Sequence, residues 1–277
     1  MIYICADDYG LCSTVSLNIL KCLNEGVLNK VSAFVNFDKI SSDEFGAGDN
    51  IALHLNLVEG RALSDLKGSL LTDEKGNFKN TFTGLLKLSL FNSKRLYEEA
   101  YREIRAQLHA FLKIFPKGEG IMIDSHQHTH MIPVVFKALL QAVSDEKVKV
   151  RYLRIPVESF VPYIKEPSLY FTYSPINIIK VALLNFLWLF NKRHFNKNPL
   201  PTGLFCGVFL SGRMDERVKK IIPHYIRLAK KKGDALEILF HPGYTDITGN
   251  KENVVFKSFY LSENRKKEFD TVMDLKG

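Results

Sequence analysis

Three histidines stand at alternate positions in the segment DSHQHTH, residues 124–130. They are His126, His128 and His130, in a chain that contains eight histidines in all. Alternate side chains of an extended segment point to one face, and neutral imidazole is the most common metal ligand in proteins. A single histidine after a strand is commonly structural, but this concentration of imidazoles predicts a metal site.

Two adjacent carboxylates, Asp7 and Asp8, follow the apolar stretch Ile2–Cys5 near the start of the chain. Neighbouring anions repel each other, and burying them without a counter-charge is costly. A divalent cation would neutralise one carboxylate and would lower the pKa of a bound water molecule. The pair therefore predicts one carboxylate that binds a metal and a second that acts as a base.

His54 interrupts the otherwise apolar, alternating stretch ALHLNL, where an unpaired imidazole would be costly. A core histidine bonded to the backbone would explain His54 alone, but beside Asp8 and His126 it is better explained as a metal ligand. One aspartate and two histidines leave coordination positions open for water and substrate, as a catalytic site requires. These ligand types fit zinc, magnesium and other divalent cations alike.

Two further polar residues follow apolar stretches. His241 precedes a Pro-Gly turn, which fits either a fixed general acid or oxyanion partner, or a surface residue beside a tight turn. Arg154, in LRIP, fits either a contact to a carbonyl or anionic group of the substrate, or a structural partner for an acid such as Asp124. The residues alone leave both choices open.

Apolar stretches typical of strands alternate with amphipathic stretches typical of helices along the chain. The first predicted strand ends near Ala6. The others cover Val31–Phe37, Asn50–Leu57, 120–126, 150–156, 203–209 and 235–241. The predicted helices start at Ser13, Ser93, Pro133, Ile176 and Asp215. This order predicts a parallel sheet with helical crossovers, either open or closed into a barrel, and barrel active sites lie at the carboxyl ends of the strands. We expect one catalytic domain over residues 1–277, with irregular insertions near residues 60–84 and 157–205.

The composition argues against several classes of protein. Lys and Arg outnumber Asp and Glu by 38 to 30, but the excess lies in short runs typical of solvated helix faces. No nucleic-acid module and no nucleotide fingerprint such as GxGxxG or GxxxxGK[ST] is present, so we expect no nucleic-acid partner. The four cysteines show no CxxC spacing, and no leader-like stretch precedes the first strand. Both observations predict a reducing, cytoplasmic location.

The most apolar segment, Ile176–Phe190, is too short to span a bilayer comfortably and contains Lys180. A buried helix or one that faces a second subunit in a homodimer is the first interpretation. The second is a helix in a membrane interface, which would give peripheral membrane contact. Trp188 and the basic segment NKRHFNK that follows favour this second interpretation.

In this order, the segments ADDYG, ALHLNLVEG, DSHQHTHMIP, RIP and EILFHPG resemble the YdjC-like carbohydrate deacetylases, which include chitooligosaccharide and hopanoid-associated branches. The resemblance runs from Ile4 to about Asp246, with Tyr9 where Phe is usual. It implies a distorted parallel (β/α) barrel related to the polysaccharide-deacetylase fold. It also implies hydrolysis of N-acetyl groups from amino sugars with one divalent metal ion, Mg²⁺ or Zn²⁺. The segment Val157–Phe205 is closer to the hopanoid-associated branch than to the chitooligosaccharide branch.

Matched motif by motif, the resemblance implies a role for each candidate residue. The metal ligands would be Asp8, His54 and His126, the general base Asp7, and the acid or orienting group His241. His128 and His130 match the motif and would either support the metal ligands or face the substrate. Arg154 is expected at a substrate-binding position on the reasoning given above. The substrate would be an N-acetylated oligosaccharide or a glycolipid.

Two rival functions fit the same residues. A metal-dependent phosphoesterase also uses paired aspartates and HxH segments, but it would need a second metal and additional ligands. A catalytically inactive saccharide-binding protein would bind its ligand without metal. The complete set of candidate residues favours the metal-dependent N-deacetylase.

Overall fold

The computed structural model describes residues 1–275 apart from 38–39, 47, 117–119 and 244–256, so the end of the family-like stretch at Asp246 lies outside the described residues. Seven parallel strands form one sheet in the order β5-β4-β3-β2-β1-β7-β6. The strands are β1 (Ile2–Tyr9), β2 (Lys30–Ala33), β3 (Asn50–Leu55), β4 (Ile121–Ser125), β5 (Val150–Leu153), β6 (Gly203–Cys206) and β7 (Ala235–Phe240). The predicted alternation of strands and helical crossovers is therefore confirmed.

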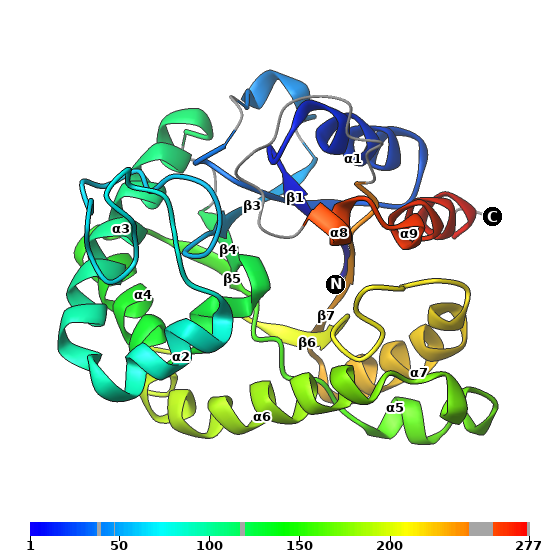
Figure 1. Cartoon of the computed structure of the whole chain (residues 1–277). Coiled ribbons are helices and arrows are strands. Elements are labelled where there is room, and N and C mark those ends of the chain that lie inside the picture. Colours follow the sequence, from blue (N-terminus) through cyan, green and yellow to red (C-terminus); the bar gives the residue numbers. More distant parts are fainter. Residues whose placement is uncertain (38–39, 47, 117–119, 244–256, 276–277) are drawn as a thin grey trace.

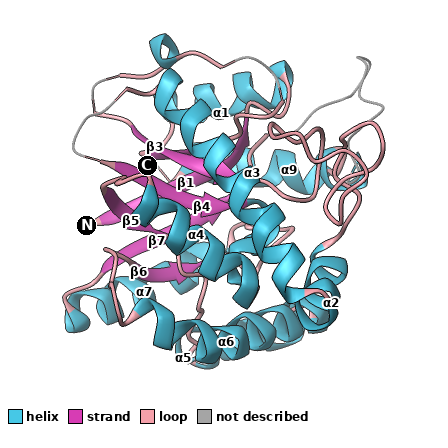
Figure 2. Cartoon of the chain, turned by 90° about the vertical axis from the view of Figure 1, so that its left-hand side faces the viewer, coloured by secondary structure: helices cyan, strands magenta, loops and turns pink. Residues whose placement is uncertain are grey.

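Helices surround the outside of the curled sheet (Figure 1). They are α1 (Ser13–Glu25), α2 (Phe82–Phe91), α3 (Ser93–Ile114), α4 (Pro133–Asp145), α5 (Val161–Ile164), α6 (Pro175–Phe195), α7 (Arg217–Lys232), α8 (Lys257–Tyr260) and α9 (Glu263–Asp274). Three 3₁₀ segments add to these, η1 (Ser42–Glu44), η2 (His126–Met131) and η3 (Pro167–Thr172). Figure 2 shows α3 and α4 packed on the outer side of the strands. None of the helices in the described ranges is long and apolar enough to cross a membrane.

The two edge strands of the sheet approach each other. The backbone N–H of Leu153, at the end of β5, donates to the carbonyl of Pro201 at 2.8 Å, and Glu158 forms a parallel bridge with Phe205 of β6. The Glu158 carboxylate then accepts hydrogen bonds from the backbone N–H groups of residues 207–209. The curled sheet is therefore a distorted barrel, as predicted.

The second strand is shorter than the sequence predicts. The apolar run Val31–Phe37 stays in the sheet only to Ala33, after which the backbone N–H of Phe34 donates to the Tyr9 carbonyl at 2.9 Å. Phe34 then packs edge-on against the rings of His54 and His126, with centroids 4.8 and 5.2 Å away. Apolar character alone did not distinguish a strand residue from one that lines the site.

The first predicted insertion is held by α3. The backbone N–H groups of Leu63 and Ser64 donate to the Glu103 carboxylate at 3.0 and 2.9 Å, and that of Leu71 donates to Glu99 at 3.1 Å. Its last residues belong to α2 rather than to an irregular segment. The second insertion contains α5, η3 and α6. Buried carboxylates of α3 thus replace the backbone partners that these loop residues lack.

Candidate metal centre

Asp8 occupies an unusual backbone position that decides where the two adjacent aspartates point. Its φ is 76°, in the left-handed region that non-glycine residues rarely adopt, and the pairing of β1 with β2 is irregular between Ala6 and Tyr9. In a regular strand Asp7 and Asp8 would face opposite sides of the sheet. The irregularity instead brings both carboxylates to His54, with Asp7 Oδ2 3.9 Å and Asp8 Oδ1 3.5 Å from His54 Nε2.

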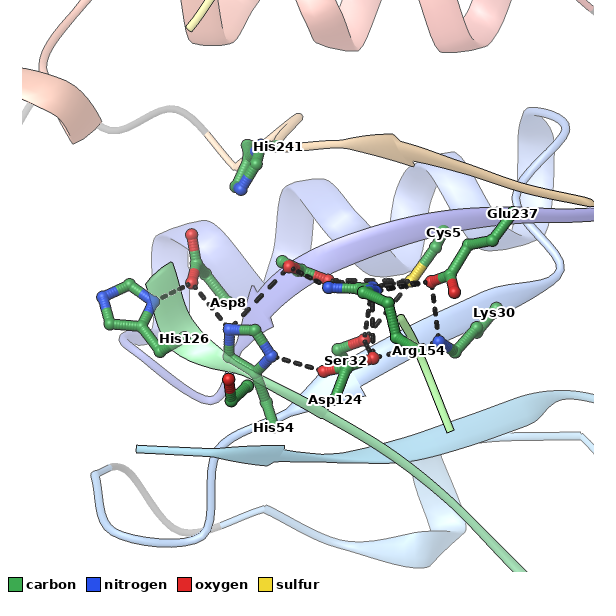
Figure 3. A network of polar contacts seen from close by, with 12 residues as sticks. Cys5, Asp8, Lys30, Ser32, His54, Asp124, His126, Arg154, Glu237 and His241 are labelled. Carbon is green, nitrogen blue, oxygen red and sulfur yellow. Dashed lines mark hydrogen bonds and ion pairs between the residues drawn. The ribbon is translucent and has the colours of Figure 1, made fainter. Parts of the chain in front are cut away.

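The carboxylate of Asp8 lies between two imidazoles. Asp8 Oδ1 is 3.2 Å from His126 Nδ1 and 3.5 Å from His54 Nε2, and Figure 3 shows the three side chains converging. All three are buried, and one ligand atom from each lies within 4.8 Å of the others. A tetrahedral cation with bonds of about 2.1 Å holds its ligand atoms about 3.4 Å apart, which matches the observed spacing.

Several polar atoms around this point lack hydrogen bonds. Asp8 Oδ1 and His54 Nε2 are buried without a hydrogen-bond partner, although such atoms are nearly always satisfied in folded proteins. A cation bound by both would supply the missing interaction. Asp8, His54 and His126 therefore fit the metal that the sequence predicts at these residues.

A carboxylate lies behind each histidine of this group. His54 Nδ1 is 2.6 Å from Asp124 Oδ1, which leaves Nε2 to face Asp8. Glu59 Oε1 lies 3.7 Å from His126 Nε2, too far for a hydrogen bond but close enough for charge attraction, while Nδ1 of the same ring faces Asp8. Carboxylates in this position fix the orientation and the tautomer of a metal-binding imidazole. Glu59 is not among the predicted site residues, although its place in HLNLVEG, close after His54, is a usable signal.

Asp7 belongs to a different cluster, which we call the ion-pair cluster: Asp7, Lys30, Asp124, Arg154 and Glu237. Arg154 donates to both Asp7 oxygens at 2.7 and 2.8 Å and to Glu237 at 2.7 Å. Lys30 Nζ contacts Asp124 at 2.9 Å and Glu237 at 2.7 Å. Figure 3 shows Lys30, Asp124, Arg154 and Glu237 on the opposite side of His54 from Asp8.

Two further sets of metal-ligand residue types occur in this cluster, one of Asp7, His54 and Asp124 and one of Cys5, Asp124 and Glu237. Their carboxylates already contact the Lys30 ammonium or the Arg154 guanidinium. A divalent cation there would meet fixed positive charge. Among the described residues, only the group at Asp8 has ligand atoms that no Lys or Arg occupies.

The neighbouring carboxylates raise the pKa of both histidines. Burial alone would lower the pKa of His54, but the carboxylates of Asp7, Asp124 and Asp8 raise it to about 9. Burial opposes the charged form of His126 as well, and Asp8 and Glu59 raise its pKa to about 10. Each protonated imidazole therefore supplies positive charge beside the carboxylates, as a bound cation would.

Metal binding is expected to release protons. At pH 7 both histidines are protonated in the ion-free site, because their pKa values of about 9 and about 10 lie above the solution pH. A cation binds only the neutral imidazole, so protons and metal compete. We expect close to two protons released per metal at pH 7 and an affinity that falls about 100-fold for each unit of decreasing pH. Calorimetric titration in buffers of different ionisation enthalpy measures this release, and an enthalpy independent of the buffer would contradict it.

Replacing Glu59 by Gln is expected to weaken metal binding by about 10- to 100-fold, because the amide no longer attracts the N–H of His126 as the carboxylate does. The measurement is the dissociation constant for Zn²⁺ and for Mg²⁺ by calorimetry. Glu98→Gln, on the exposed side of α3, is the matched control. An unchanged affinity in Glu59→Gln would mean that Glu59 does not position His126.

His241 follows β7 and faces Asp8 in Figure 3. Its backbone N–H donates to Glu268 Oε2 at 2.6 Å, and its ring packs edge-on against Phe259 with centroids 5.4 Å apart. Gly243 in the same turn packs so closely on α1 that a Cβ there would lie 2.3 Å from Val15 Cγ1. His241 Nδ1 has no hydrogen-bond partner, and burial lowers the pKa of the ring. His241 is thus a fixed imidazole beside Asp8 rather than a surface residue.

The three histidines of DSHQHTH do not share one face, so that prediction is wrong. Residues 126–131 form a 3₁₀ segment, in which Gln127 and His128 have φ values of 51° and 57°. These left-handed residues break the alternation, and each ring takes its own environment. His126 alone reaches Asp8.

The contacts of His130 and Arg154 favour positioning roles. His130 is fully buried, with Nδ1 2.5 Å from Ser125 Oγ and Nε2 2.8 Å from the carbonyl oxygen of Arg154. Burial lowers the pKa of His130 to about 4. Arg154 is also fully buried, with its guanidinium bonded inside the ion-pair cluster. The predicted substrate contacts of both residues gain no support. His128 is half-buried against Phe205, and its unpartnered Nδ1 keeps the substrate-facing prediction open.

The fold and this centre together define an α/β barrel with a buried carboxylate–imidazole group, a candidate cation site, at the carboxyl ends of β1, β3 and β4. The model of the family described as YdjC-like protein matches residues 1–276, and the chain belongs to this family.

Two curated relatives illustrate the relationship. The chain is 32% identical over 167 residues to a carbohydrate deacetylase of Danio rerio, which covers 55% of this chain and 48% of the relative. It is 27% identical over 146 residues to a chitooligosaccharide deacetylase of Yersinia enterocolitica, with 51% of this chain and 54% of the relative covered. The chain thus spans about half the length of these relatives.

A crystal structure from Enterococcus faecalis, of a protein named for the cleavage of cellobiose phosphate, has the same fold. It superimposes with a TM-score of 0.65 at 18% identity and covers 98% of this chain and 90% of that protein. This likeness confirms the fold class and carries no conclusion about the reaction.

Proposed function

We propose that this chain removes N-acetyl groups from an amino-sugar-containing substrate, either an oligosaccharide or a glycolipid. The observation that carries the proposal is the buried group of Asp8, His54 and His126, whose Asp8 Oδ1 and His54 Nε2 lack hydrogen-bond partners. Membership of the YdjC-like family and the names of the deacetylase relatives support the same reaction.

The three residues would hold one divalent cation, Mg²⁺ or Zn²⁺. When bound there, such a cation supplies Lewis acidity that polarises a carbonyl and lowers the pKa of water. Asp124 and Glu59 orient the two imidazoles, and Phe34 excludes water from their faces. The ligand types suit both metals, so the choice between them rests on measurement.

Asp7 is assigned as the proton acceptor. Burial opposes its charge, but Arg154 outweighs this effect and holds the pKa of Asp7 below its usual range. The carboxylate is therefore ionised at neutral pH and lies 3.9 Å from His54 Nε2, beside the proposed cation position. It can accept a proton from attacking water, while its bonds to Arg154 keep it in place.

His241 is assigned as the proton donor to the leaving amine, because an amide nitrogen leaves poorly without a proton. Replacing His241 by Ala is expected to lower kcat by about 100- to 10,000-fold with little change in KM. An activated acetyl ester, whose leaving group needs no proton, should lose far less activity. Equal losses on the sugar and on the ester would contradict the role as donor.

The rival phosphoesterase has less support in the site. It would use two metals, whereas the other ligand-like groups among the described residues are occupied by Lys30 and Arg154. The deciding experiment incubates the protein with soluble N-acetylglucosamine oligomers, with N-acetylglucosamine-bearing lipids and with p-nitrophenyl phosphate. Release of acetate and free amine in equal amounts is expected. Phosphate ester cleavage without acetate release would favour the phosphoesterase, and binding of the sugar without either product would favour a saccharide-binding protein.

A further inference from the structure

Helix α6 exposes large apolar side chains on its outer side. The α6 face, as we call it, consists of five residues with the following exposed fractions: Leu189 67%, Ile179 65%, Ile176 62%, Phe186 53% and Phe190 50%. Ile176, Ile179, Phe186 and Phe190 follow one stripe of the helix. Phe171, a few residues before the helix, is fully exposed as well. A surface helix in water normally presents polar residues there.

The buried side of α6 carries polar residues that anchor the helix. Asn177 Nδ2 donates to the carbonyl of Ser211 and Asn191 Nδ2 to that of Met131, both at 2.8 Å. Asn185 accepts from the backbone N–H of Glu158 at 3.1 Å. The amides satisfy backbone groups of the barrel, so turning the helix to bury the α6 face would break all three bonds. The exposed apolar side is therefore the fixed outer side of the helix.

The sequence segment that contains α6 carries charges of one sign only. From residue 167 to residue 214 the sequence contains no Asp or Glu, while it contains Lys180, Lys192, Arg193, Lys197 and Arg213. Lys180, Lys192 and Arg193 are exposed, and no carboxylate of the described residues forms an ion pair with them. Apolar side chains flanked by cations are the pattern of helices that lie in an anionic membrane interface.

We propose that the α6 face docks on a membrane surface rich in anionic lipids. The apolar side chains enter the boundary between headgroups and acyl chains, and Lys180, Lys192 and Arg193 contact the anionic headgroups. A second copy of the chain fits less well. A two-fold dimer through this face would bring the same cations of both copies together without carboxylates to pair with them.

The docking surface is connected to the metal centre. Asn191 holds the Met131 carbonyl at the end of η2, the segment that begins with His126. Helix α2 exposes Leu90 and Phe91 and leads into α3, and each of the two helices carries an exposed lysine close to these side chains in the sequence, Lys87 in α2 and Lys94 in α3. A chain docked by α6 would therefore present this side of the barrel to sugars attached to membrane lipids. This last consequence alone rests on the proposed function.

The test is sedimentation of the protein with vesicles of phosphatidylcholine, with or without phosphatidylglycerol. Wild-type protein should bind the mixed vesicles and bind much less to phosphatidylcholine alone. The triple variant Lys180→Gln/Lys192→Gln/Arg193→Gln should bind about 100-fold more weakly, since each cation near an anionic surface contributes about a tenfold effect or somewhat less. The double variant Phe186→Ser/Phe190→Ser should bind the mixed vesicles at least about tenfold more weakly than the wild-type protein. Leu17→Ser, an exposed apolar residue of α1, is the matched control and should bind as wild type does.

Binding is measured without any sugar, so its outcome is independent of the deacetylase reaction. All substituted side chains are exposed, and unchanged thermal unfolding of the variants would verify that they fold. Failure of the wild-type protein to bind mixed vesicles would overturn the proposal. A dimer in sedimentation velocity that Phe186→Ser/Phe190→Ser dissociates, without vesicle binding, would instead make the α6 face a subunit interface.

Discussion

Asp8→Asn is expected to abolish specific metal binding, with an affinity at least about 100-fold lower than that of the wild-type protein. Asp8 supplies the only carboxylate among the three proposed ligands, and both histidines face its Oδ1. An amide there carries no charge to offset a divalent cation. Binding stoichiometry and affinity from calorimetry, with Mg²⁺ and with Zn²⁺, measure the effect.

Asp7→Asn is the informative comparison, because Asp7 bonds to Arg154 and is not one of the three proposed ligands. It should keep one metal per chain and lose turnover by about 100-fold or more, as expected for loss of a general base. If Asp7→Asn lost the metal while Asp8→Asn kept it, the assignment of the two aspartates would be reversed.

Arg154→Met is expected to destabilise the protein by about 3–5 kcal/mol. The change leaves Asp7, Asp124 and Glu237 buried with Lys30 as the remaining fixed cation of the ion-pair cluster. Urea unfolding measures the loss. Lys266→Met is the control, because Lys266 forms a surface ion pair with Asp270 and the two side chains are 60% and 50% exposed, which predicts a loss below about 1 kcal/mol.

Arg154→Lys separates charge from geometry. A lysine restores one positive charge but cannot bond to both Asp7 oxygens and to Glu237 at once. We expect partial recovery of stability with turnover still reduced, because Asp7 is then less firmly placed. Full recovery of both would mean that the charge of Arg154 is sufficient.

The sequence was most informative where side-chain type and strand position agreed. Asp8, His54 and His126 were predicted as one group because each stands at the carboxyl end of an apolar stretch, and parallel strands bring these ends together. The structure places the three within reach of one ion. Their function as ligands remains a prediction that the metal titrations test.

Backbone conformation and burial set the limit of that reasoning. The alternation of His126, His128 and His130 assumed an extended chain, and the left-handed Gln127 and His128 break it. Arg154 was expected either to contact the substrate or to pair with an acid such as Asp124, and three carboxylates from other strands, Asp124 among them, surround it. The other two partners, Asp7 and Glu237, lie far from Arg154 in the sequence, so no local pattern reveals them. Glu59 was missed because a single glutamate in a loop resembles a surface residue, and only its position shortly after His54 in HLNLVEG set it apart.

We predict that a cation held by Asp8, His54 and His126 is required for release of acetate from an N-acetylated sugar. The most direct measurement is acetate release by metal-stripped protein before and after addition of Mg²⁺ or Zn²⁺, with Asp8→Asn measured alongside. We predict no release without metal, recovery with one equivalent per chain, and no recovery in the variant. Acetate release by the stripped protein at the full rate, or full recovery in Asp8→Asn, would contradict the claim.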